Sequence, residues 1–258
     1  MIDSLYIGAS GLVSHQKSVD TIGNNLANMN TTAYKKERVA FHELYQSELQ
    51  RVDPASGTSS GPATPSGIAV GSVDRMFTEG EYVKSDSNLD VAIRGNGFFE
   101  VELPGGASAF TRTGTFHVNN DRMLVTSDGY PLKQQIAIPE GTTSVTIDPD
   151  GSVHAVVQGE TTPEDIGTIE LVQFTNPAAL KALGGGTYTA SDAAGEPQTG
   201  KPGENGLGLL AQGFTESSNV KLVDELTMLM VAQRSYEASS KVVQTSDEIL
   251  GMINNLRR

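Results

Sequence analysis

The side chains that could carry acid–base or metal chemistry in this sequence are its histidines and carboxylates, because the chain contains no cysteine. His15, His42, His117 and His154 lack the spacing of metal ligands and have no glutamate nearby in a zinc-binding pattern. Without cysteine, neither a disulfide framework nor a thiolate zinc site can form. The sequence therefore predicts no metal site.

Two glycine-containing loops match ligand-binding motifs only in part. Asp148-Pro149-Asp150-Gly151 could begin a calcium loop, but Val153 and Gly159 stand where an EF-hand needs glycine and glutamate. Gly95-Asn96-Gly97 follows an apolar run, but Phe98 stands where a phosphate-binding helix would begin. No serine lies in a nucleophile elbow. We therefore expect that the protein is not an enzyme and that it has no catalytic residue and no cofactor.

The charge of the chain argues against several classes of partner. The formal net charge is −13, and residues 51–213 carry −11 of it. Nucleic acids and anionic membranes are bound through Lys and Arg, so we expect neither nucleic-acid binding nor membrane insertion. No run approaches the ~20 apolar residues of a membrane span. The start is acidic at Asp3 and its first basic residue is Lys17, so we expect no cleaved signal peptide.

The elements that must position these residues can be inferred from the distribution of helix-breaking residues. All 11 prolines lie between Pro54 and Pro202, and 24 of the 28 glycines lie between Gly57 and Gly213. Proline and glycine both disfavour helices, so the chain reads as helix, then a long turn-rich β region, then helix. The predicted fold class is α+β, with discontinuous terminal helices that form a coiled-coil domain.

Both ends carry an apolar stripe at helical spacing. In the first segment the stripe contains Leu5, Ala9, Leu12, Val19 and Leu26. In the last segment one stripe contains Leu222, Leu226, Leu229, Tyr236, Val243 and Leu250, and an adjacent stripe contains Val242, Ile249, Ile253 and Leu256. Asn219 is a candidate N-cap. Two stripes on one long helix favour contacts with more than one other helix.

The middle of the chain predicts antiparallel β structure, strongly twisted or barrel-like. Short alternating segments recur between turn signals, as in Asp90–Ile93, Phe98–Leu103, Ser108–Phe116, Met123–Thr126, Ser144–Ile147, Ser152–Val157 and Thr168–Phe174. We expect a terminal helical assembly domain of residues 1–35 with 215–258. An extended connecting segment, 36–75, contains a Gly/Ser/Pro-rich loop at 53–67, and the central β domain spans 76–214.

Three groups of short motifs follow one another along the chain. NNLANMN (Asn24–Asn30) precedes Thr32, Tyr34 and Lys35 near the N-terminus. In the middle lie DVAIRGNGFFEV (Asp90–Val101), FTRTGTF (Phe110–Phe116) and LVTSDGYPL (Leu124–Leu132). At the C-terminus lie ESSNV (Glu216–Val220), Glu225-Leu226 and QRSYEASSKVV (Gln233–Val243). Taken together and in this order, they resemble the flagellar rod and hook axial proteins of bacteria.

The resemblance implies a structural subunit of the flagellar distal rod, because Tyr45 to Pro65 looks like the extra segment of distal rod members. Such subunits polymerise into a helical tube that carries motor torque to the hook and passes exported subunits through its channel. The implied partners are other copies of the chain, proximal rod proteins, the hook protein, the surrounding P- and L-ring proteins and the flagellar type III export apparatus. The implied location is the basal-body rod that crosses the periplasm. The alternatives are a proximal rod subunit and a non-flagellar fibre module.

The stripes and the resemblance together give three sets of candidate functional residues. The subunit-assembly set is Leu5, Leu12, Val19, Asn24, Asn25, Leu26, Asn28, Leu226, Leu229, Gln233, Arg234, Tyr236 and Val243. The rod-stiffening set is Tyr45, Pro54, Pro62 and Pro65, and the β-domain motif set is Asp90, Gly95, Gly97, Phe98, Phe99, Arg112, Gly114 and Phe116. The sequence departs from the family pattern at Ala33, where glycine is usual, and at Asp121-Arg122, which replaces a glycine-containing turn.

Overall fold

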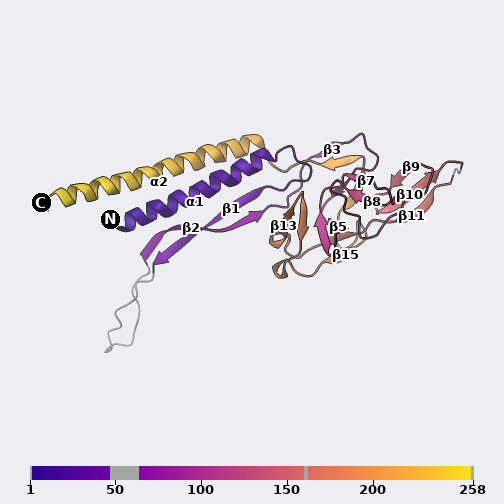
Figure 1. The fold of residues 1–258 in the computed structure, drawn as a ribbon, viewed down its shortest axis with the longest axis horizontal. Helices are drawn as coiled ribbons and strands as arrows, with labels where there is room; N and C mark the ends of the chain where they lie inside the picture. The colour runs from indigo at the N-terminus through magenta and orange to yellow at the C-terminus, as the bar shows by residue number, and fades with distance from the viewer. Residues whose placement is uncertain (1, 47–63, 160–161, 257–258) are drawn as a thin grey trace, which may run out of the picture. The chain divides into compact units, whose positions relative to one another are not determined.

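The computed structural model describes residues 2–46, 64–159 and 162–256, which form two compact units (Figure 1). The helical unit takes its residues from 1–27, 37–75 and 221–258, and the β unit takes its residues from 28–36 and 76–220. Whereas the sequence places boundaries at residues 35 and 215, the structure places both 28–36 and 215–220 in the β unit. Neither long helix of the described residues has an apolar stretch that could cross a membrane.

The helical unit consists of two helices and one hairpin. Helix α1 spans Ile2–Ala27 and α2 spans Leu222–Leu256, while β1 (Glu37–Gln46) pairs antiparallel with β2 (Thr64–Arg75). In this unit α1 lies between α2 and the hairpin (Figure 1). The described part of the predicted connecting segment is therefore a two-stranded ribbon that packs on α1.

Small side chains dominate the contact between α1 and α2. A Cβ atom on Gly8 would lie 2.7 Å from Val243 Cγ2, and one on Gly11 would lie 2.9 Å from Ser239 Oγ. The most buried positions of α1 are accordingly Gly8, Gly11, Ser14, Thr21, Ile22 and Asn25, while Leu5, Leu12, Val19 and Leu26 are half-buried and Ala9 is exposed. Where two helices approach closely, only small residues fit directly between the helix axes, and longer side chains point to either side of the contact.

The β unit is built from short strands in small antiparallel sheets. Its largest sheet has the strand order β13-β14-β6-β5-β12-β15, and a second sheet has the order β11-β10-β9. The pairs β16-β4, β17-β3 and β7-β8 complete the set. No sheet of the described residues closes on itself, so the expected barrel-like form is not confirmed.

Each segment predicted between Asp90 and Phe174 overlaps a strand, but strands β3 and β13–β17 and nearly all of β7 and β11 lie outside the predicted segments. The strand bounds are β3 Tyr82–Lys84, β4 Val91–Arg94, β5 Phe98–Glu102, β6 Ser108–Thr111, β7 Phe116–Val118, β8 Leu124–Thr126, β9 Thr142–Ile147, β10 Ser152–Val157, β11 Glu164–Thr168, β12 Leu171–Gln173, β13 Lys181–Gly184, β14 Thr187–Thr189, β15 Gln198–Gly200, β16 Leu209–Gln212 and β17 Phe214–Glu216. Two short 3-10 helices, Pro177–Ala179 and Asp192–Ala194, lie among the later strands.

The central strands of the six-stranded sheet are buried on both faces, whereas the edge strand β13 is exposed. Successive residues of a strand point to opposite faces, and in β5 Phe99 enters the main core with Val91 and Leu124 while Phe98 enters a second, aromatic cluster. The rings of Phe98 and Phe77 meet edge to face with centroids 5.2 Å apart. This double burial explains the near-continuous apolar run at the GNGFFEV motif.

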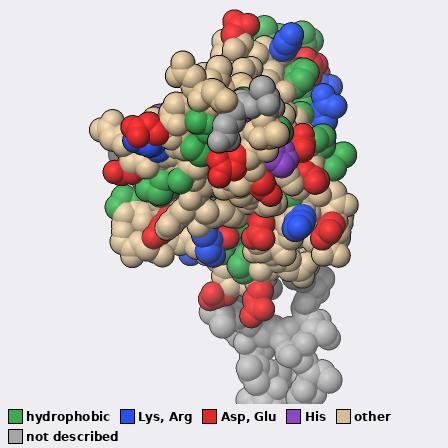
Figure 2. All heavy atoms as spheres, turned by 90° about the vertical axis from the view of Figure 1, so that its right-hand side faces the viewer, with side chains coloured by type: hydrophobic (Ala, Val, Ile, Leu, Met, Phe, Trp, Pro, Cys, Tyr) green, Lys and Arg blue, Asp and Glu red, His purple; other side chains and the backbone are tan. Residues whose placement is uncertain are grey.

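One face of the β unit carries many charged side chains. Figure 2 shows Asp and Glu side chains spread over the face at the end that carries β9–β11, with Lys and Arg side chains among them. Interspersed charges of this kind keep a domain soluble.

Both departures from the family's glycine pattern adopt the left-handed backbone conformation that favours glycine. Ala33 has φ 56° and Arg122 has φ 61°. For residues with a Cβ atom this conformation costs roughly 1–2 kcal/mol. Ala33 is held there by an amide that donates to the Glu216 carbonyl at 2.7 Å, and Arg122 by an amide that donates to the Asn119 carbonyl at 3.0 Å.

Replacing Arg122 by glycine should therefore stabilise the β unit. The half-exposed arginine side chain packs little, so the relief of strain should exceed the extra chain entropy of glycine by about 0.5 kcal/mol. The matched control is Asp121→Gly, since Asp121 does not have a positive φ and this variant should lose about 0.5 kcal/mol. Urea unfolding followed by circular dichroism measures both, and equal losses in the two variants would contradict the assignment of strain.

Candidate functional site

The three groups of sequence motifs meet at one buried carboxylate, Glu216, at the end of β17. Lys35 Nζ lies 2.5 Å from Glu216 Oε1, and Arg112 Nε lies 2.8 Å from Glu216 Oε2. The three side chains are at most 3% exposed. We call Lys35, Arg112 and Glu216 the ionic junction. Lys35 lies in the segment that follows α1, and Glu216 lies shortly before α2.

Arg112 also organises the Gly95-Asn96-Gly97 loop. Its Nη1 donates to the carbonyls of Gly95 and Gly97 at 3.0 Å each, and its Nη2 donates to those of Gly95 and Ile93. Gly95 and Gly97 have φ 114° and 136°, a conformation that turns these carbonyls toward the guanidinium. A phosphate-binding loop presents N–H groups instead, so this loop holds a cation of the protein itself.

Backbone groups of the segment before β3 complete the junction. The Gly80 amide donates to Glu216 Oε1 at 2.9 Å, and Lys35 Nζ donates to the Thr78 carbonyl at 2.7 Å. A Cβ on Gly80 would lie 2.0 Å from the Ser217 carbonyl oxygen, so this close approach requires glycine. Buried charges are tolerated only when paired and hydrogen-bonded, and each of these three is both.

The charges of the junction perturb one another. Burial would raise the pKa of Glu216, but the adjacent Arg112 and Lys35 outweigh it and hold that pKa below the ordinary value. Burial, assisted by Arg112, lowers the pKa of Lys35 despite the attraction of Glu216. One carboxylate thus pairs with two cations, which makes Glu216 the member on which the other two depend.

Asn219 links the ionic junction to the backbone at Lys36 and Met76. It does not cap α2, so the prediction that Asn219 is the N-cap of this helix is wrong. Its Oδ1 accepts the Lys36 amide at 2.7 Å, and its Nδ2 donates to the Met76 carbonyl at 2.8 Å and to Thr78 Oγ1 at 2.9 Å. Helix α2 begins later, at Leu222. The Asn219 side chain bonds to two segments that are distant in the sequence, around Lys36 and at Met76–Thr78, which the pattern of its neighbours in the sequence could not reveal.

In the helical unit, Asn25 plays a comparable part. It is 1% exposed, and its Nδ2 donates to the Glu37 carbonyl at 2.8 Å while its Oδ1 accepts the Glu37 amide at 2.9 Å. The same Nδ2 lies 3.2 Å from the buried carboxylate of Glu225. Asn25 therefore fastens the end of α1 to the start of the hairpin and to α2.

The other predicted assembly residues are distributed between two environments. Leu5, Leu12, Val19, Leu26, Leu229 and Val243 are half-buried within the helical unit, and Asn28 is half-buried in the β unit. Asn24, Leu226, Gln233, Arg234 and Tyr236 are exposed. The structure also exposes apolar residues that the predicted set omits, among them Val13, Val223 and Val231 at 69%, 74% and 60%.

The β-domain motif residues serve the core and the junction. Phe99 and Phe116 meet edge to face at 5.1 Å, and a Cβ on Gly114 would lie 1.7 Å from the Val91 carbonyl oxygen. Asp90 accepts a hydrogen bond from Ser85. Of the rod-stiffening set, Tyr45 pairs with Pro65 across the hairpin, while Pro54 and Pro62 lie outside the described residues.

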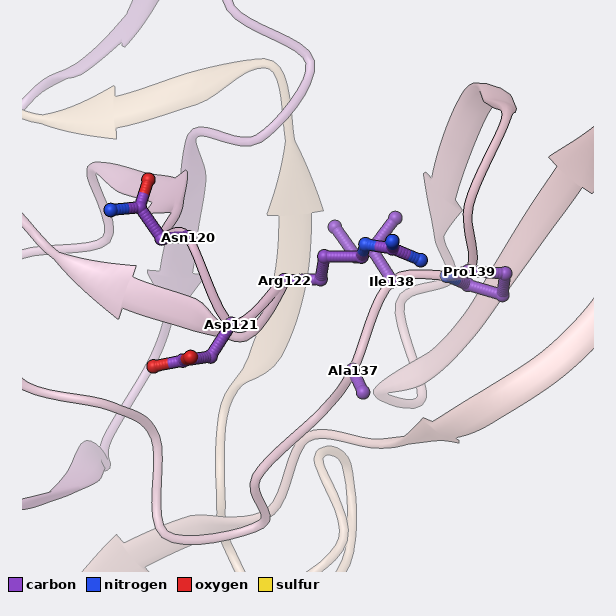
Figure 3. A pocket seen from close by; sticks show the side chains of 6 residues that line it. All are labelled: Asn120, Asp121, Arg122, Ala137, Ile138 and Pro139. Atoms are coloured by element: carbon purple, nitrogen blue, oxygen red, sulfur yellow. The ribbon is translucent and has the colours of Figure 1, made fainter.

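A surface pocket lies between the turn at Asn120–Arg122 and Ala137–Pro139 (Figure 3). Asn120 and Asp121 point away from the side chain of Arg122, which pairs with the exposed Glu140. This arrangement brings no acid, base and nucleophile together. Within the described part of the chain, no three His, Asp or Glu side chains are grouped to hold a metal ion, and the Asp148–Gly151 segment is a turn.

Glu216→Gln should destabilise the β unit by about 3–5 kcal/mol at pH 7, because it leaves two buried cations without a counter-charge. The folded-state pKa of Glu216 is lowered, so its contribution is complete above the unfolded value of about 4.5 and is lost as pH falls below it. The difference in the free energy of unfolding between variant and parent, measured with urea, should therefore become smaller below pH 4.5. Glu140→Gln, which removes an exposed partner, should change stability by less than about 1 kcal/mol.

Comparisons with known proteins agree with this arrangement. Three family profiles match: the flagella basal body rod protein at residues 5–35, the FlgE/F/G hook protein D1 domain at 92–155, and the FlgEFG rod protein C-terminal region at 211–256. The chain is similar to three proteins named flagellar basal-body rod protein FlgG. That of Buchnera aphidicola subsp. Acyrthosiphon pisum is 39% identical, covering 99% of this chain and 100% of the relative.

That of Borreliella burgdorferi is 39% identical over 100% of both chains, and that of Caulobacter vibrioides is 38% identical over 99% of this chain and 100% of the relative. The junction residues Lys35, Arg112 and Glu216 fall one in each of the three matched profiles. This chain therefore belongs to the FlgG family of flagellar basal-body rod proteins.

Proposed function

We propose that this structural subunit of the flagellar distal rod polymerises into a helical tube through the exposed apolar side chains of its helical unit. The tube transmits torque from the motor to the hook, and exported subunits pass through its channel. Contacts that do not close on themselves generate helical filaments, which is the kind of contact that such a tube needs.

The observation that carries this proposal is the apolar surface of α2. From its first turn to its last, α2 exposes Leu222, Val223, Leu226, Met228, Met230, Val231, Tyr236, Val242, Ile249, Met252 and Ile253. Helix α1 adds Tyr6, Ile7 and Val13. Exposed apolar surface on this scale marks an interaction site, and its burial between copies would contribute about 25 cal/mol per Å².

The finer features of the polymer are part of the proposal. The paired α1 and α2 act as a coiled-coil assembly domain, with the thirteen predicted assembly residues at or near contacts between copies. The tube joins proximal rod proteins at one end and the hook protein at the other, and the ring proteins surround it. The subunit crosses the periplasmic space as part of the rod and reaches it through the flagellar type III export apparatus, without a cleaved signal. The acidic surface of the β unit keeps it soluble.

Replacing one exposed valine of α2 should test the assembly surface directly. Val231→Asp places a charge on that surface and should abolish tubes and oligomers without a loss of helical circular dichroism. Val83→Asp is the matched control, since Val83 is a comparably exposed valine of the β unit. Sedimentation and negative-stain electron microscopy give the readout, with a chain of residues 28–220 as the non-assembling reference. If Val231→Asp, Val83→Asp and the chain of residues 28–220 all assembled equally well, the proposal would be refuted.

Replacing the residues between the two paired strands should test the stiffening role proposed for Pro54 and Pro62, while Tyr45 and Pro65 are kept. Gln46 pairs with Thr64, so residues 47–63 can be replaced by Asn-Gly, a two-residue turn that preserves the register. We expect a folded, exported subunit whose tube bends more easily, like a hook. Persistence length measured by electron microscopy is the readout, and an unchanged value would contradict the role.

A further inference from the structure

We propose that the ionic junction, together with Asn219, holds the connecting segments of the chain against the β unit in the unassembled subunit. The chain would then leave and re-enter this unit at fixed neighbouring points before any other copy is bound. The inference concerns the isolated subunit, so it does not depend on polymerisation.

The first argument is the position of the segments that lead to the two helices. Both belong to the β unit, and they lie side by side: the Ala33 amide donates to the Glu216 carbonyl at 2.7 Å, and the Asn219 amide donates to the Tyr34 carbonyl at 3.3 Å. These bonds join residues far apart in the sequence without involving the helical unit. The junction adds a direct link, since Lys35 and Glu216 are 181 positions apart.

The second argument is that a third segment connecting the two units is held at the same position in the β unit. The chain passes between units at 27/28, 36/37, 75/76 and 220/221. Three of these passages are tied through Asn219, which accepts the Lys36 amide and donates to the Met76 carbonyl. The Met76 amide in turn donates to the Lys36 carbonyl at 2.9 Å.

The third argument is the dependence of these contacts on charge. Glu216 Oε1 is shared by Lys35 Nζ and the Gly80 amide, and Oε2 is taken by Arg112. Removing the negative charge leaves two cations that repel one another in a buried site. The segment that carries Lys35, residues 28–36, is the part most easily expelled from the β unit. It is short, and both of its ends continue into the helical unit.

Hydrogen exchange of the full-length monomer, read by mass spectrometry or NMR, tests the proposal. In the parent protein, the amides of Ala33, Lys36 and Gly80 should exchange at least about 100-fold more slowly than unstructured amides. Glu216→Gln should raise exchange at these three amides by about 100-fold or more. Glu100→Gln is the matched control, because Glu100 is a buried carboxylate of the same unit whose partner, Lys133, is half-exposed.

A second variant keeps the test decisive if Glu216→Gln fails to fold. Lys35→Met leaves the Arg112–Glu216 pair intact, so exchange should rise selectively at Ala33 and Lys36 while strands β5 and β6 stay protected. Unprotected Ala33 and Lys36 amides in the parent monomer would overturn the proposal. Equal rates of amide hydrogen exchange in the Glu216→Gln and Glu100→Gln variants would also overturn it.

Discussion

The burial of one negative charge between two positive charges is the interaction on which the β unit depends. Lys35, Arg112 and Glu216 come from segments that are distant in the sequence, and each is tolerated in the interior only beside a charge of opposite sign. The same requirement shapes their surroundings. Gly80 must be glycine for the backbone to approach, and the Gly95-Asn96-Gly97 loop must turn its carbonyls inward to satisfy the guanidinium. Asn219 extends the network to Lys36 and Met76.

The two units solve different physical problems. The β unit buries large apolar and aromatic side chains on both faces of its main sheet. The helical unit brings α1 close to α2 at Gly8 and Gly11, and leaves many of its large apolar side chains exposed. An isolated helix pair of this kind gains little from its internal contact, so its stability depends on what covers the remaining surface.

Much of the architecture could be predicted because its signals are local. The clustering of prolines and glycines gave the helix–β–helix order, and alternating patterns gave strands β4, β5, β6, β8, β9, β10 and β12 of the β unit. The hairpin β1–β2, strands β3 and β13–β17, and nearly all of β7 and β11 were not predicted, since their pairing is decided by distant partners. Lys35 and Glu216 stood inside quoted motifs, but a charged residue looks like a surface residue until its partners are known. Asn219 looked like a helix cap for the same reason: its nearest neighbours in the sequence are not its partners in space.

The separation of Lys35 from Glu216 also sets an order of events in time. The β unit contains residues 28–36 as well as 76–220, so its first segment emerges early during synthesis and must wait for a partner near the far end. Closing so long a loop is entropically costly and kinetically slow. Until the last strand is available, Arg112 and Lys35 lack their counter-ion, and the interior cannot close around them. The buried charge network of such a chain therefore cannot be completed until most of the chain is available.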